Sequence, residues 1–168
     1  MTEPAASSAR RRRRVARLAA VQALYAMEVA GATAEAALRE RLQIEMPGAD
    51  IGEALPEPDR DLLSELVFGV NQQRESLAPS ISAALTGGRE FARLEILLRC
   101  ILLAGAYELA SRPDIPRNVV INEYVELSHA FFAAKEPMLV NAVLDRLADS
   151  LRASDAERPI VADDAGNG

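Results

Sequence analysis

Apolar residues recur along most of this chain at intervals of three and four positions, the spacing that places them on one face of an α-helix. The clearest segment holds Leu62, Leu63, Leu66, Val67 and Val70 on a single helical face. The pattern predicts an all-α fold with about seven helices and no convincing strand. The expected helices span residues 8–30, 34–45, 59–75, 79–85, 89–110, 116–132 and 137–152.

Helix-breaking residues mark the expected helix ends. Gly31 should end the first helix, residues 47–58 form a loop on composition, and the Thr-Gly-Gly sequence at 86–88 precedes the fifth helix. Three prolines are expected in first turns, where a missing N–H removes no helical hydrogen bond: Pro79, Pro116 and Pro137.

Residues 89–110 form the most apolar of the expected helices. Positions 94–109 are apolar nearly all round, which places this helix at the centre of the fold. Val119–Ile121 resemble a strand, but Val120, Tyr124 and Leu127 keep helical spacing. Short connections between most helices favour antiparallel neighbours.

The chain is expected to form one helical domain over residues 9–152, with an arginine-rich N-terminal arm. Residues 1–8 and 153–168 are small or polar and are expected to be disordered. Hydrophobic residues make up 49% and charged residues 26%, which indicates a globular protein. Aromatic residues reach only 4% and tryptophan is missing, so the core should be aliphatic.

The sequence offers little catalytic chemistry. Cys100 and His129 are the single cysteine and histidine, which excludes an intrachain disulfide and a cysteine- or histidine-based metal site. Asn122, Glu123 and Asn141 have no nucleophile, phosphate loop or metal spacing beside them, so we interpret them as structural hydrogen-bonding groups. We therefore expect no enzyme activity, metal or cofactor, with Cys100 as a small core residue.

Membrane insertion is not expected. The longest uncharged stretch, residues 76–88, has 13 residues, whereas a spanning helix needs about 20. The arginines ahead of an apolar segment have an alternative interpretation as a twin-arginine export signal. Arg17, Gln22 and Glu28 interrupt that segment at helical spacing and argue against it. We expect a cytoplasmic protein.

Charge is unevenly distributed. Residues 1–17 carry six arginines and one glutamate, a net charge of +5, whereas the rest of the chain carries −11 and the whole chain −6. A basic arm on an acidic body indicates a polyanionic partner for the arm.

One stripe of the first helix is cationic in its first turns and apolar further along. Arg10, Arg14 and Arg17 lie within about 60° of one another. In the next turns the stripe continues through Leu18, Val21 and Tyr25. Burying several guanidiniums without partners is costly, so the first turns should project past the core or lie along its rim.

RNA is the polyanion that suits this arm best. Arginine binds phosphates through two nitrogens and stacks on unpaired bases, and exposed Gln22 and Tyr25 would add base contacts. The alternatives are a solubilising cationic tail, or rim arginines that pair with the acidic body.

Four segments resemble motifs of the NusB family of bacterial transcription antitermination factors. They are ARRRRRVARLAAVQALYAMEVAG (9–31), LAGAYEL (103–109), DIPRNVVINEYVELSHAFF (114–132) and LVNAVLDRLA (139–148), in the family's order. The resemblance extends from about Ala9 to Leu151. It implies two packed three-helix sub-bundles and no active site.

The resemblance also implies a function. Family members pair with the ribosomal protein NusE, bind the single-stranded boxA element of nascent ribosomal RNA and support antitermination by RNA polymerase. It implies RNA contacts by Arg10, Arg11, Arg12, Arg13, Arg14, Arg17, Gln22, Tyr25 and the segment from Phe131 to Lys135. It assigns Glu95 and Arg99 to the NusE surface.

Three positions depart from the family pattern. Leu103 and Met138 stand where basic residues are usual, and Ala142 replaces a glycine. RNA contacts should therefore shift toward the arm, offset in part by Lys135, the only lysine. Two other functions remain open: a detached RNA-binding module of a ribosomal RNA methyltransferase system, and a helical protein-interaction module. A homodimer also remains open, because some members dimerise.

Overall fold

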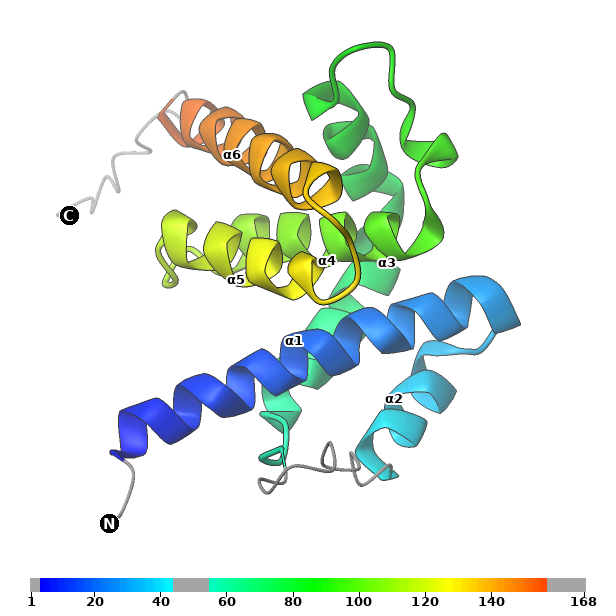
Figure 1. Cartoon of the computed structure of the whole chain (residues 1–168), viewed down its shortest axis with the longest axis vertical. Coiled ribbons are helices and arrows are strands. Elements are labelled where there is room, and N and C mark those ends of the chain that lie inside the picture. Colours follow the sequence, from blue (N-terminus) through cyan, green and yellow to red (C-terminus); the bar gives the residue numbers. More distant parts are fainter. Residues whose placement is uncertain (1–3, 44–54, 157–168) are drawn as a thin grey trace, which may run out of the picture.

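The computed structural model describes residues 4–43 and 55–156, and over these ranges it contains helices and no strand (Figure 1). The elements are α1 (Ala5–Ala30), α2 (Ala34–Gln43), α3 (Arg60–Ala84), the short 3-10 helix η1 (Phe91–Arg93), α4 (Ile96–Ser111), α5 (Arg117–His129) and α6 (Lys135–Ala156). The expected all-α fold is confirmed, and the helix count is close to seven.

The helices form two groups of three. Helices α1, α2 and α3 contact one another, and so do α4, α5 and α6. The groups are joined chiefly through α4, which also packs against α1 and α3, while α3 reaches α6 (Figure 1). These groups are the two three-helix sub-bundles that the resemblance implies.

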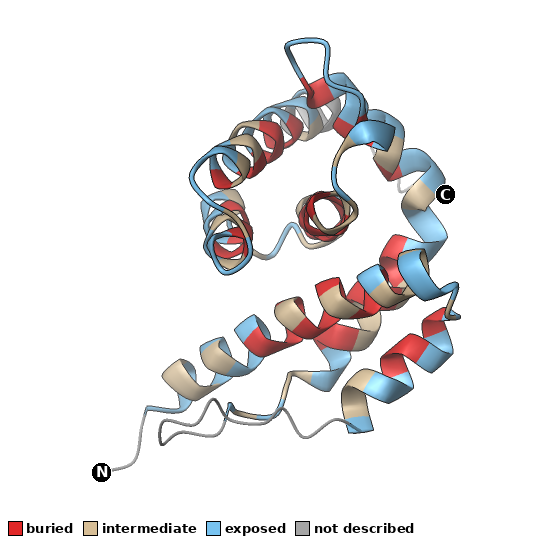
Figure 2. Ribbon diagram, turned by 45° about the vertical axis from the view of Figure 1, so that its right-hand side comes forward, coloured by how far each residue is buried: buried red, intermediate tan, exposed pale blue. Residues whose placement is uncertain are grey.

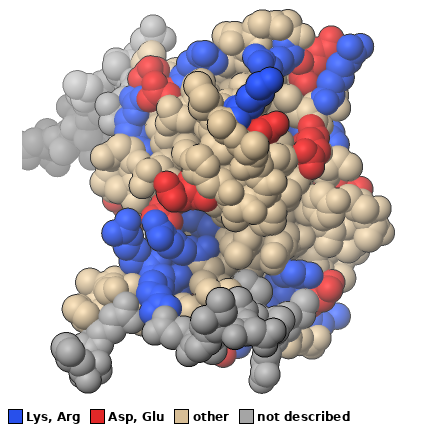
Figure 3. Space-filling model, in the orientation of Figure 1, with Lys and Arg blue, Asp and Glu red and all other residues tan. Residues whose placement is uncertain are grey.

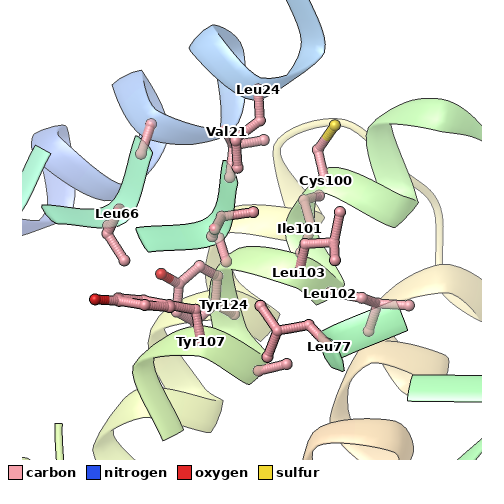
Figure 4. Packing of buried hydrophobic residues seen from close by; sticks show 14 of the residues in the cluster. Val21, Leu24, Leu66, Leu77, Cys100, Ile101, Leu102, Leu103, Tyr107 and Tyr124 are labelled. Atoms are coloured by element: carbon pink, nitrogen blue, oxygen red, sulfur yellow. The ribbon is translucent and has the colours of Figure 1, made fainter. Parts of the chain in front are cut away.

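Helix α4 provides the centre of an aliphatic core. Every residue from Cys100 to Glu108 is buried, and buried positions concentrate on the inward faces of the surrounding helices (Figure 2). Side chains of α1 and α3 meet those of α4 there (Figure 4). Gly105 lets α6 approach closely, because a Cβ at this position would lie 2.9 Å from a methyl carbon of Leu144. The expectation that Cys100 is a core residue is confirmed.

The two helices expected over residues 59–75 and 79–85 are one helix, α3, with Pro79 inside it. Proline removes one backbone donor and crowds the carbonyl of the preceding turn. The apolar face nevertheless continues in phase through this point, and Leu77 and Ile81 are buried on either side of the exposed Pro79. Packing of this face outweighs the local cost of the proline.

The helix expected over residues 89–110 begins only at Ile96. Gly87 and Gly88 adopt positive φ angles of 70° and 72°, and η1 then turns the chain so that Phe91 is buried. The last helix begins at Lys135, two residues before Pro137, where it was expected to begin. Proline is tolerated at this position because N–H groups in the first turn of a helix have no hydrogen-bond acceptor within the helix.

The ends of the chain also differ from expectation. Residues 5–8 and 153–156 are helical, as the first turn of α1 and the last of α6, although both were expected to be disordered. Residues 1–3 and 157–168, most of the loop expected over 47–58, and the end of the helix expected over 34–45 lie outside the described residues.

A buried ion pair ties α1 to the central helix. The Arg17 Nη2 atom lies 2.5 Å from Glu108 Oε1, and Nε donates to Oε2 at 3.0 Å. The Tyr124 hydroxyl donates to Glu108 Oε2 at 2.7 Å. Burial, followed by the nearby carboxylate charge, raises the pKa of the Tyr124 hydroxyl well above its ordinary value, so this group remains a donor. Three helices thus share one carboxylate.

Removing the Glu108 charge should destabilise the fold strongly. Glu108→Gln leaves the buried guanidinium of Arg17 with only the more distant carboxylate of Glu123, 3.8 Å away, a loss of up to about 3–5 kcal/mol in the free energy of unfolding. The double variant R17M/E108Q should lose less than the two single variants together, because the unpaired charge is gone. Urea unfolding followed by circular dichroism measures all four proteins, and additive losses would contradict the coupling.

Cys100 should be inert toward thiol reagents while the protein is folded. Burial, with a further contribution from the Glu28 charge, raises the pKa of the thiol to about 12. At pH 8 the folded thiolate population is then on the order of a thousandfold smaller than in an unfolded chain, whose thiol pKa is about 8.5.

Iodoacetamide labelling in native buffer should therefore follow global unfolding. Labelling at the rate of an unfolded peptide would contradict this. Because folding raises the thiol pKa, the stability contribution of Cys100 is complete below about pH 8.5 and declines as the pH rises toward about 12.

Candidate nucleic-acid interface

The arginine run lies in the second and third turns of α1. Arg10, Arg12, Arg13 and Arg14 are exposed and Arg11 is half-buried. This end of α1 extends past the other helices (Figure 1), and basic side chains gather over it with acidic ones beside them (Figure 3). These positions therefore lie outside the core, at the rim of the bundle.

Glu123 of α5 holds three arginines of α1. The Arg14 Nε atom donates to its Oε2 at 2.9 Å, while Arg10 Nη2 lies 3.7 Å from Oε1 and Arg17 Nη1 lies 3.8 Å from Oε2. Glu123 is 5% exposed, but the side chains of Arg14 and Arg10 remain 49% and 64% exposed. The carboxylate therefore fixes these two arginines at the rim without covering them.

Arg17 is a correction to the predicted arm. Its side chain is 4% exposed and its guanidinium is occupied by Glu108, so it lies in the core although it shares the helical phase of Arg10 and Arg14. Guanidiniums are costly to bury without partners, and Arg17 can be buried because Glu108 and Glu123 pair with it. It does not lie on the surface expected to contact RNA.

Arg12 joins the arm to the segment that precedes α3. Its Nε atom donates to the Glu57 carbonyl at 3.4 Å, and its own carbonyl accepts from the Asp59 N–H at 3.0 Å. Asp59 in turn caps α3 by accepting from the Leu62 N–H at 3.1 Å. The guanidinium of Arg13 has no partner among the described residues and is open to solvent.

A first hollow of about 240 Å³ lies between α1 and α5. Its lining combines charged and apolar side chains: Arg14, Arg17, Leu18, Glu123, Glu126, Leu127 and Ala130. Leu18 follows Arg14 by one helical turn, so the hollow begins where the cationic part of the stripe ends.

A second hollow of about 330 Å³ lies further along α1. It is lined by Gln22, Tyr25, Ala26, Arg41, Glu95, Leu97 and Phe131. Four residues predicted to bind RNA or a partner thus converge from separate segments. The Gln22 Oε1 atom accepts from Arg41 Nη1 at 3.2 Å, and Tyr25 and Phe131 are each 41% exposed, which leaves two aromatic side chains accessible to a ligand.

One stripe of α1 connects the two hollows. Arg14, Leu18, Gln22 and Tyr25 follow one another at helical spacing, and the end of α5 borders both hollows through Ala130 and the adjoining Phe131. We call the residues that line the two hollows, apart from the buried Arg17, together with the exposed arginines of positions 10–14, the α1 groove.

Other predicted site residues lie apart from the hollows. Lys135 is exposed at the start of α6, and Arg99 is half-buried with its Nε atom unpaired. Glu95 lines the second hollow and Arg99 does not, so the two predicted partner-binding residues are separated. Met138 is 72% exposed, whereas Leu103 is fully buried and is no part of the surface.

Sequence reasoning missed Arg41 and Glu126. Both are charged residues on helices that were interpreted through their apolar faces, and only tertiary packing brings them beside α1. Within the described ranges, no three acidic, cysteine or histidine side chains are grouped to hold a metal ion. Nor does any described helix have the length and apolar character needed to cross a membrane.

Comparison with known proteins adds independent information. The model of the NusB family matches residues 14–149. The "Transcription antitermination protein NusB" of Brucella anthropi is 46% identical over 145 residues, covering 84% of this chain and 84% of that protein. The protein of the same name from Maricaulis maris is 40% identical over 142 residues, covering 84% and 89%.

Solved structures share the fold. The structure "T. maritima NusB, P3121, Form 2" matches with a TM-score of 0.68 and 25% identity, over 89% of this chain and 93% of that one. A chain in "Crystal Structure of a Plectonemic RNA Supercoil" matches with a TM-score of 0.70 and 22% identity, over 84% and 97%, a likeness of fold alone. With a family match over most of its length and relatives at 40% to 46% identity, the chain belongs to the NusB family.

Proposed function

We propose that this protein is an RNA-binding transcription antitermination factor without enzymatic activity, whose RNA-binding surface is the α1 groove. One observation carries the proposal: exposed arginines at the start of α1 continue, on the same helical stripe, into two hollows that hold Gln22, Tyr25 and Phe131. The name "Transcription antitermination protein NusB" of its relatives supports this reading.

The chemistry of the groove suits single-stranded RNA. Guanidiniums bind phosphates, and exposed aromatic rings stack on bases that are not paired. The chain as a whole carries a net charge of −6, so phosphates are repelled from much of its surface and attracted to this end of α1. Lys135, four positions after Phe131 in the sequence, adds an exposed cation at the start of α6.

The specific RNA and protein partners are proposed from the resemblance to the NusB family. The proposed RNA is the boxA element of nascent ribosomal RNA, bound in the cytoplasm together with the ribosomal protein NusE as part of an RNA polymerase antitermination complex. Glu95 is proposed to contact NusE, because it lies on the rim of the second hollow, with Arg99 further along α4. The expected RNA-binding role of the arginine run is retained without Arg17.

A titration of single-stranded boxA RNA against salt tests the arm. Arg10→Gln with Arg13→Gln removes two exposed charges that no described residue holds strongly. Single-stranded RNA releases counter-ions with a slope of about −0.7 per phosphate contact, so this variant should flatten the slope by up to about 1.4. Fluorescence anisotropy, with and without NusE, gives both affinity and slope.

A matched variant separates contact from net charge. R89Q/R93Q makes the same charge change in the exposed segment between α3 and α4 and should leave the slope unchanged. Equal flattening in both variants would remove the arm from the RNA surface. Equal binding of a scrambled RNA would favour the protein-interaction alternative, and methyl transfer from a labelled donor would favour the methyltransferase alternative.

Met138 offers a gain-of-binding test. It is 72% exposed and stands one helical turn after Lys135, where the family usually has a basic residue. Met138→Lys should add one phosphate contact, steepen the salt slope by about 0.7 and tighten RNA binding severalfold. Met138→Gln is the uncharged control, and a slope unchanged by the lysine would place the first turn of α6 outside the RNA path.

A further inference from the structure

The first hollow holds two carboxylates among its lining side chains, one more than the second hollow, which has Glu95. Glu123 and Glu126 both line it, beside Arg14 and Arg17. Glu123 is occupied by arginines, as its contacts with Arg14 and Arg10 show. Glu126 is exposed, and its carboxylate makes no hydrogen bond or ion pair with another described residue. One hydrogen-bond acceptor in the hollow is therefore free.

The position of Glu126 is unfavourable for a phosphate and favourable for a hydrogen-bond donor. A free carboxylate repels phosphate, and when ionised it only accepts hydrogen bonds. A nucleotide bound here would therefore place its phosphate on the arginine side and turn the donor groups of its base toward Glu126. The apolar part of the lining, Leu18, Leu127 and Ala130, suits the faces of a base.

The size of the hollow limits what it can hold. At about 240 Å³ it lies below the range of about 300–1,000 Å³ that is usual for drug-sized ligands. A single unstacked base is an occupant of the right scale. Single-stranded RNA presents such bases, with their Watson–Crick edges free for hydrogen bonding.

Among the four bases, guanine matches a free carboxylate best. Its Watson–Crick edge carries two adjacent donors, N1–H and the 2-amino group, which can face the two oxygens of one carboxylate. Adenine and cytosine each place an acceptor beside their single amino group, and uracil places its one N–H between two carbonyls. A pair of parallel hydrogen bonds to a charged acceptor is the stronger and more selective arrangement.

We propose that the hollow between α1 and α5 is a guanine-selective subsite and that Glu126 is its specificity-determining residue. This inference rests on the proposed RNA-binding function and adds a base preference to it. Arg14, held by Glu123, provides the adjacent phosphate-facing cation, so affinity and selectivity come from different side chains of the same hollow.

A set of short RNAs tests the subsite. The probes are oligouridylates of about twelve nucleotides with a single central guanosine, inosine or adenosine, titrated by fluorescence anisotropy at one salt concentration. The wild-type protein should bind the guanosine RNA about tenfold more tightly than the adenosine RNA, within the range expected for a two-bond base contact. Inosine, which keeps N1–H and lacks the 2-amino group, should fall between them.

The variant Glu126→Gln should reduce the guanosine-to-adenosine ratio to about twofold, because the amide presents only one acceptor. Glu75→Gln removes one exposed carboxylate from α3, which does not line the hollow, and should keep the wild-type ratio. Taking the ratio cancels the general gain in affinity that loss of a negative charge brings to both RNAs.

The outcomes separate the inference from the function on which it rests. If binding depends on salt but the guanosine-to-adenosine affinity ratio is the same in the wild type and in Glu126→Gln, the subsite is overturned and the RNA-binding function is retained. A ratio near one in the wild-type protein also overturns it. Failure of all RNAs, including boxA RNA with NusE, to bind in a salt-dependent manner overturns the proposed function itself.

Discussion

The carboxylate of Glu108 is the point on which the arrangement of the helices around α1 depends. It is fully buried in α4 and is shared by the guanidinium of Arg17 and the hydroxyl of Tyr124. A buried charge is tolerated only with close partners, so α1 and α5 must meet α4 in the one register that supplies them. That register also brings Glu123, next in sequence to Tyr124, opposite Arg14 and Arg10. The pair in the core and the rim of the groove are thus parts of one network.

Arg10, Arg14 and Arg17 lie on one face of α1, and their burial increases along the helix. Arg17 is buried and structural, Arg14 is half exposed and donates from Nε to both oxygens of Glu123, and Arg10 is 64% exposed with a long contact of 3.7 Å to the same carboxylate. The gradient follows from the path of α1, which leaves the bundle toward its N-terminus (Figure 1). A run of similar residues therefore changes from core anchor to accessible cation within two turns of helix.

Much of this structure could be predicted from local sequence. Helical periodicity identified the helices and their inward faces, because burial selects residues at 3.6-residue spacing. The central helix was identified because residues 94–109 are apolar nearly all round. The position of Pro79 inside a continuous helix could not be predicted from local sequence, because it depends on the burial of Leu77 and Ile81 in the core.

The partner of Arg17 lies 91 residues away, and phase along one helix carries no information on such a contact. For the same reason Gln22, Tyr25 and Phe131 became candidates chiefly through family resemblance, and Arg41 and Glu126, which line the hollows, were not among the predicted site residues.

Under the proposed RNA-binding function, the mixture of charges in the groove has a physical rationale. Exposed arginines alone bind any polyanion, because phosphate contacts carry no sequence information. Glu123 limits this by holding Arg14 and Arg10 in place, so that part of their charge is neutralised while their outer surfaces stay accessible. An acidic body around the groove further disfavours RNA that approaches without fitting it. On this proposal, RNA affinity is concentrated where guanidiniums, aromatic rings and hydrogen-bonding groups lie along α1, and a ligand gains most when the groove accommodates its bases as well as its phosphates.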